Sequence, residues 1–169
     1  MKYSDEKDKC YGIAGMAIGI ALWEGEDFLF SLDMDNEENR HITFTPDFYF
    51  ESNPNITPKE TWHNSLLRYQ MAMGMMIANL MGRSVKNKGI NGSKIKKALY
   101  KTIAEEGKNV CQLDEDEIRS LYDETYSLTY RAFNSPRIIE MLDQIVEKLA
   151  ENRTLSNYEI KELLGVIKE

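Results

Sequence analysis

The segment at residues 57–81 constrains the fold of this chain most. Thr57 suits the N-cap of a helix, Pro58 suits its first position, and Glu60 can close a capping box with Thr57. Apolar residues follow at three- and four-residue spacing, and over residues 71–81 the other faces are apolar as well. A helix that is apolar on every side is buried. The sequence therefore predicts a long central helix around which the rest of the chain packs.

Residues 57–169 are predicted to form a bundle of about five helices. After a loop at 86–92, each of four further helix starts carries capping residues or a proline, followed by apolar residues at helical spacing. These starts are marked by Ser93, by Asp114 with Glu117, by Ser135 with Pro136, and by Ser156 with Glu159. The connection at 152–155 is short, so the last two helices should be antiparallel neighbours.

Residues 11–51 are predicted to form a sheet. Large apolar side chains occupy the even positions in each of three runs, at 15–23, 28–34 and 42–50, and this period of two is typical of strands. Polar turns separate the runs. Pro46 cannot donate a hydrogen bond to a neighbouring strand, so the third strand should be an edge strand or carry a bulge.

The first of these runs has a helical alternative. Gly12, Gly15 and Gly19 would form a stripe of small residues on one face of a helix. Each glycine costs a helix about 1 kcal/mol relative to alanine, which favours the strand. The expected fold class is therefore α+β in a single domain over residues 1–169. An N-terminal three-stranded antiparallel meander packs on the helical bundle and buries its apolar face there.

The cysteines and the apolar runs indicate the compartment. Cys10 and Cys111 are too few for a disulfide framework, which favours reduced thiols in a cytoplasmic protein. The first ten residues mix lysines with acids, unlike a secretory signal. The apolar runs at 11–23 and 71–81 are too short to span a bilayer, so no membrane contact is expected.

No catalytic residue, metal site or cofactor is predicted. His41 and His63 are the only histidines, and each lies in a Glu-x-x-His pattern like that of di-iron helix bundles. The first pattern, with Glu38, falls in a predicted turn, and in the second Glu60 already caps a helix. The acidic run at 33–38 lacks the central glycine of an EF-hand. The methionines at 71–81 are interpreted as core residues rather than as a soft metal site or an adaptable binding surface.

Tyr122, Tyr126 and Tyr130 are spaced at four residues and share one stripe of a predicted helix. Tyrosine is enriched at protein interfaces, because its ring can be buried while its hydroxyl stays hydrogen-bonded. The stripe is therefore a candidate interface, and its alternative is the margin of the core.

Charge is segregated along a chain with a net charge of −7. Residues 61–104 contain eight basic and no acidic side chains, whereas residues 105–124 contain eight acidic and two basic ones. Lysines crowd the first turn of the helix that follows Ser93, where the helix dipole disfavours cations. The candidate anion-binding residues are Ser93, Lys94, Lys97 and Lys101. The alternative is internal pairing of this basic helix with the acidic residues 114–117.

The leading functional hypothesis is a non-enzymatic interaction or accessory protein that contacts itself or another protein through a helix or sheet face. One alternative is a nucleic-acid- or phosphate-binding protein that uses the basic segment 83–101, although the net charge opposes broad electrostatic affinity. A second alternative is an enzyme without a legible motif, with a pocket between sheet and helices.

Overall fold

The computed structural model describes residues 2–36, 40–49, 58–86 and 92–165. These residues form an α+β fold in which a helical bundle accompanies a three-stranded antiparallel sheet, which confirms the predicted class. The helices are α1 (Glu6–Ala21), α2 (Pro46–Tyr49), α3 (Pro58–Lys86), α4 (Gly92–Val110), α5 (Glu115–Ala132), α6 (Pro136–Asn152) and α7 (Asn157–Leu164). The strands are β1 (Leu29–Asp33), β2 (Ile42–Phe44) and β3 (Thr154–Ser156), and a 3-10 turn, Glu26–Phe28, precedes β1.

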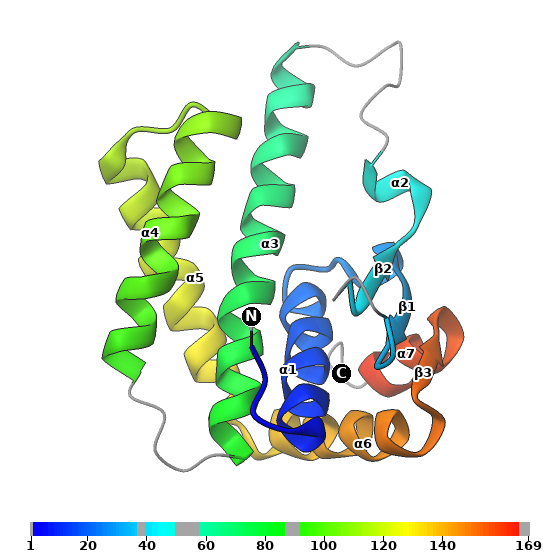
Figure 1. Cartoon of the computed structure of the whole chain (residues 1–169). Coiled ribbons are helices and arrows are strands. Elements are labelled where there is room, and N and C mark those ends of the chain that lie inside the picture. Colours follow the sequence, from blue (N-terminus) through cyan, green and yellow to red (C-terminus); the bar gives the residue numbers. More distant parts are fainter. Residues whose placement is uncertain (1, 37–39, 50–57, 87–91, 166–169) are drawn as a thin grey trace.

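The long helix α3 is central, as predicted. It packs against α1, α4 and α5, and it separates two apolar cores. In Figure 1 the sheet, α1 and α7 lie on one side of α3, the α4–α5 pair lies on the other, and α6 runs across the base. No residue of the stretch 71–81 that was predicted to be buried on every side is fully exposed, but the burial is uneven, because Met73 is buried whereas Met76 is only half-buried.

The strand predicted at 15–23 is wrong, because these residues belong mostly to helix α1. Both the large and the small side chains of α1 are buried, so period-two alternation does not separate an inner face from an outer one. The glycines permit close contact with α3. A Cβ atom on Gly15 would lie 2.4 Å from the carbonyl oxygen of Ala78, and one on Gly19 would lie 2.8 Å from that of Gly74. This close packing offsets the low helix propensity of glycine.

The sheet has the order β2-β1-β3, and its third strand comes from the C-terminal part of the chain. Leu32 of β1 pairs with Ile42 of β2 on one side and with Leu155 of β3 on the other. The predicted runs at 28–34 and 42–50 therefore supply two strands, and residues from Pro46 onward turn into α2. The expectation of a meander confined to residues 11–51 is wrong, because the third strand, β3, follows α6 in the chain and pairs with β1.

The predicted starts at Asp114, Ser135 and Ser156 are confirmed as N-cap positions, whereas α4 begins at Gly92, so Ser93 lies inside the helix and is not its cap. The Asp114 carboxylate accepts from the Glu117 amide at 2.9 Å, and the Glu117 carboxylate accepts from the Asp114 amide at 2.8 Å. Ser156 and Glu159 form the same reciprocal capping box at α7. The predicted cap Thr57 lies outside the described residues. Among the helices described, none is both long and apolar enough to cross a membrane.

Candidate functional site

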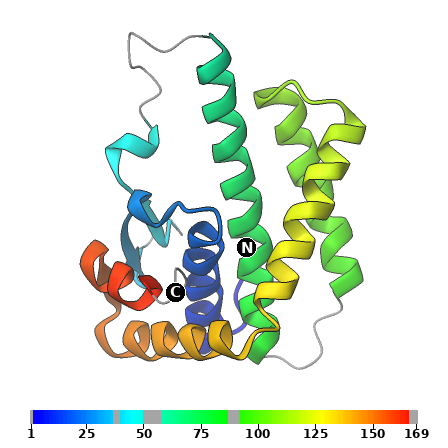
Figure 2. The same ribbon diagram turned by 180° about the vertical axis from the view of Figure 1, so that it is seen from behind.

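The residues singled out in the sequence lie on one structural unit, the α4–α5 hairpin. The two helices are antiparallel neighbours joined by a short connection at 111–114. Lys97 and Lys101 are exposed on α4, and the three tyrosines follow one another along α5. The side chains of Ser93 and Lys94 lie outside the described residues. Figures 1 and 2 show that one side of the hairpin packs on α3, while no other described element covers the opposite side.

A groove of about 340 Å³ lies between α4 and α5. Its volume is at the low end of those found for ligand sites, and helix–helix clefts are a common place for them. Three cations, two tyrosines and one carboxylate line the groove: Lys96, Lys97, Tyr100, Arg119, Tyr122 and Asp123. The lining is thus aromatic at its base with an excess of positive charge.

Two of the three cations of the groove, Lys96 and Arg119, lie over aromatic rings of the hairpin. The Nζ atom of Lys96 lies 4.7 Å from the ring centre of Tyr126 and 2.7 Å from Oδ1 of Asp123. The Arg119 guanidinium lies 5.8 Å from the ring centre of Tyr100. Cation–π contacts of this kind stabilise by about 0.5–1 kcal/mol at exposed positions. They hold the cationic side chains beside the tyrosines.

The predicted pairing of the basic helix with residues 114–117 is wrong for its described side chains. Because the helices run antiparallel, the first turns of α4 face the middle and C-terminal part of α5, so Lys96 pairs with Asp123. Residues 114–117 lie at the other end of the hairpin. Lys97 and Lys101 make no ion pair with any described residue. These two cations are therefore available to an external anionic group.

The tyrosine stripe passes from the core to the surface. Tyr122 is 1% exposed, its hydroxyl donates to the carbonyl oxygen of Lys96 at 2.7 Å, and burial raises its pKa. Tyr126 is half-buried, and Tyr130 is 54% exposed. The rings of Tyr126 and Tyr130 stack at 6.4 Å with an interplanar angle of 8°. Only the C-terminal end of the stripe is open to a partner.

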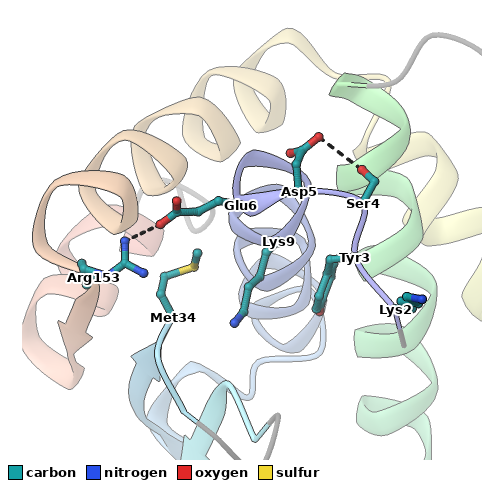
Figure 3. Close-up of a pocket in the computed structure, with 8 residues that line it drawn as sticks. All are labelled: Lys2, Tyr3, Ser4, Asp5, Glu6, Lys9, Met34 and Arg153. Atoms are coloured by element: carbon teal, nitrogen blue, oxygen red, sulfur yellow. Dashed lines mark hydrogen bonds and ion pairs between the residues drawn. The ribbon is translucent and has the colours of Figure 1, made fainter.

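A second cavity, of about 620 Å³, lies at the N-terminal end of α1 (Figure 3). Arg153, in the left-handed conformation with φ 64°, ends α6 and lines this cavity. Its guanidinium bonds the Asp35 carboxylate, with 2.6 Å between Nε and Oδ2, and it also pairs with Glu6. The hydrogen bonds from Arg153 hold the pKa of Asp35 below its usual range. Lys9 extends between Met34 and Tyr3 in this view.

This second cavity has no local signature in the sequence. Its lining comes from residues 2–9, from Met34 after β1 and from Arg153 after α6, and no local pattern joins these segments. The acids that line it, Asp5 and Glu6, are engaged by Lys86 and Arg153. The cavity is therefore held together by internal ion pairs between elements that are distant in sequence.

The histidines and cysteines occupy separate places. His41 is 3% exposed, and its Nδ1 donates to the carbonyl oxygen of Asp33 at 2.9 Å, while its Nε2 has no hydrogen-bond partner among the residues that the structure describes. His63 is exposed on α3, and Glu38 of the first Glu-x-x-His pattern lies outside the described residues. Cys10 and Cys111 are buried free thiols, and burial raises the pKa of both.

The described histidine, cysteine, aspartate and glutamate side chains do not gather in any group of three or more able to hold a metal ion. The α4–α5 hairpin, with its exposed lysines and its partly exposed tyrosines, is therefore the candidate site. Comparison of the chain with protein-family models, with curated proteins and with solved structures finds no match, so the functional argument rests on this geometry.

Proposed function

We propose that this protein is a non-enzymatic, cytoplasmic interaction protein whose α4–α5 hairpin binds an acidic protein surface. The observation that carries the proposal is that one hairpin carries both Lys97 and Lys101, which have no ion pair within the described chain, and the partly exposed tyrosines of α5. Tyrosine and arginine are enriched at protein interfaces. The buried, unpaired thiols of Cys10 and Cys111 fit a reducing compartment.

The hairpin combines the two contributions that a protein contact needs. The stacked rings of Tyr126 and Tyr130 offer apolar area at a low cost in side-chain entropy. Lys97 and Lys101 lie one turn apart on α4, so two carboxylates of a partner segment can meet them together. Partner and protein then complement each other in charge, which favours correct association over wrong partners.

Nucleic-acid binding is the weaker alternative, because the basic surface is short. Arg83 and Lys86 are held by Asp8 and Asp5 of the N-terminal region, which removes them from the basic segment 83–101. The exposed acid Glu105 lies one further turn along α4 from Lys101. A rise of about 1.5 Å per residue puts this acid about 6 Å from the last lysine along the helix axis. An extended polyanion would meet it, whereas a short acidic segment would not.

Fluorescence anisotropy tests the proposal with a labelled eight-residue peptide that carries six carboxylates and one tyrosine. We expect binding with a dissociation constant on the order of 100 μM at physiological salt, as for a short, exposed contact. The double variant Lys97→Glu/Lys101→Glu should weaken binding at least tenfold. The matched control Lys7→Glu/Lys148→Glu changes the net charge equally, at exposed positions of α1 and α6, and should bind like the parent.

A single-stranded oligonucleotide of similar total charge serves as the competing probe. We expect it to bind more weakly than the peptide. Absence of peptide binding would contradict the proposed function. Tighter binding of the oligonucleotide, lost in the Lys97→Glu/Lys101→Glu variant, would show that the face recognises nucleic acid instead.

A further inference from the structure

The α4–α5 hairpin is electrically polarised along its length. At the end where α4 begins and α5 finishes, the described charges are mainly basic: Lys96, Lys97, Lys101 and Arg131, with Asp123 and Glu124. At the end where α4 finishes and α5 begins, they are mainly acidic: Glu105, Glu106, Asp114, Glu115, Asp116 and Glu117, with Lys108 and Arg119. The polarity runs along one stripe of α4, because Lys97, Lys101 and Glu105 are spaced at four residues.

Internal pairing leaves both ends charged. Lys96 is neutralised by Asp123 at 2.7 Å, but Lys97 and Lys101 are not paired within the described chain. At the other end, the ion pair of Glu115 with Arg119 spans 3.8 Å, and both side chains are more than 60% exposed. Glu105 and Glu106 are exposed and have no ion pair in the described structure. The hairpin therefore presents a positive and a negative patch about 12 Å apart along its axis.

Both patches adjoin exposed apolar side chains. Tyr130, 54% exposed, lies near the basic end. Val110, 60% exposed, lies at the acidic end, where the indole N–H of Trp62, itself 49% exposed, donates to the carbonyl oxygen of Cys111 at 3.3 Å. Three of the five large apolar side chains that are strongly exposed in the described chain are thus at the two ends of this hairpin.

We infer that the acidic surface recognised by the hairpin is the hairpin of a second copy of this chain, in antiparallel orientation. This inference rests on the proposed function. A twofold axis perpendicular to the helices places the basic end of each copy on the acidic end of the other, so every favourable contact occurs twice. Tyr130 of each copy then approaches the end that carries Val110 and Trp62. Parallel pairing would set like charges together, which is unfavourable.

Sedimentation velocity over 5–200 μM protein tests this arrangement with complementary charge variants. Lys97→Glu/Lys101→Glu makes both ends of the hairpin acidic, and Glu105→Lys/Glu106→Lys removes the excess of negative charge at the acidic end. The second variant places cations near the C-terminus of α4, where the helix dipole favours them. We expect the parent to dimerise within this range, and each variant alone to do so at least tenfold more weakly.

An equimolar mixture of the two variants distinguishes a direct contact from a folding defect. The stripe at positions 97, 101 and 105 of α4 is wholly acidic in one variant and wholly basic in the other, so the mixture should form a one-to-one dimer at least as tight as that of the parent. The Lys7→Glu/Lys148→Glu control should dimerise like the parent. Circular dichroism of each variant checks that it is folded.

The outcomes separate this inference from the proposed function. A parent that stays monomeric at 200 μM but binds the acidic peptide would overturn the second-copy arrangement and leave the interaction function standing. A monomeric parent that also fails to bind the peptide would overturn both. A dimer that persists unchanged in both charge variants would use another surface and would overturn the antiparallel arrangement.

Discussion

Arg83 of α3 holds the carboxylate of Asp8 in α1 with two hydrogen bonds, 2.9 Å from Nε to Oδ1 and 2.7 Å from Nη2 to Oδ2. The side chain of Asp8 is fully buried, and that of Arg83 is 15% exposed. The Ser4 amide donates a further bond to Asp8 at 2.8 Å, and the Arg83 guanidinium lies 5.0 Å from the ring centre of Tyr3. A bidentate pair of this kind fixes both distance and orientation, so it locks α1 onto α3.

Replacing Asp8 by alanine should lower the free energy of unfolding by about 3–5 kcal/mol, because the substitution leaves the guanidinium partly buried without its partner. Urea denaturation measures the loss. Lys86→Ala is the control, since its partner Asp5 is largely exposed and such pairs contribute about 0–1 kcal/mol. Equal losses in the two variants would contradict a dominant role for the buried pair.

Gly15→Ala should destabilise the protein, although the same change stabilises an exposed helix by about 1 kcal/mol. The added methyl group would lie 2.4 Å from the carbonyl oxygen of Ala78, so α1 and α3 must separate. Overpacking of this kind costs about 1–3 kcal/mol. Gly165→Ala adds a methyl group with nothing within 4 Å and should change the melting temperature little. A Gly15→Ala variant more stable than the parent would refute the close contact.

Met73→Asp should lower the free energy of unfolding by more than about 3 kcal/mol, because a carboxylate would enter a site that is 1% exposed. Met76→Asp should cost clearly less, since Met76 is half-buried and its carboxylate can reach water. Chemical denaturation of the two variants compares the faces of α3 directly. Similar losses would mean that α3 is enclosed on both faces.

His41→Gln should flatten the dependence of stability on pH between 7 and 5. Burial lowers the pKa of His41 below the ordinary value of about 6.5, the nearby Lys9 acts in the same direction, and the hydrogen bond to the Asp33 carbonyl opposes them. Below 6.5 the unfolded chain therefore binds a proton that the folded chain does not, and the parent loses stability as the pH falls. Denaturation at several pH values gives the slope, and identical slopes for the two proteins would exclude His41 as its source.

Tyr122→Phe should destabilise by about 1 kcal/mol, because the carbonyl oxygen of Lys96 loses its buried donor. Tyr130→Phe should leave stability unchanged, since this side chain is 54% exposed. Thermal unfolding distinguishes the two positions. A larger effect at Tyr130 would contradict the division of the stripe into a buried and an exposed end.

Local patterns in the sequence determined where helices begin. The capping boxes at Asp114 with Glu117 and at Ser156 with Glu159 form as expected, because all their hydrogen bonds lie within four residues. The start of α3 at Pro58 and that of α6 at Pro136 also agree with the sequence. Such signals need no information about distant parts of the chain.

The candidate site could be predicted only in part from the sequence. The segregation of charge and the spacing of the tyrosines predicted candidate site residues on two helices. These helices are α4 and α5, which form the hairpin. The ion-pair partner of Lys96 and the burial of each tyrosine were not predictable. They depend on the antiparallel register of the two helices, which aligns Lys96 with Asp123.

The sequence by itself determined the starts of α5, α6 and α7, the central position of α3 and the α+β class. Only the tertiary structure decided that residues 15–21 are helical and that the third strand is β3. The alternation of large and small residues around Gly15 suits both a strand and a small-residue helix face. The helix is favoured over the strand by Gly74 and Ala78 of α3, about sixty residues away, because these small residues allow α1 and α3 to approach closely. Contacts between such distant segments, unlike caps, are absent from any short stretch of sequence.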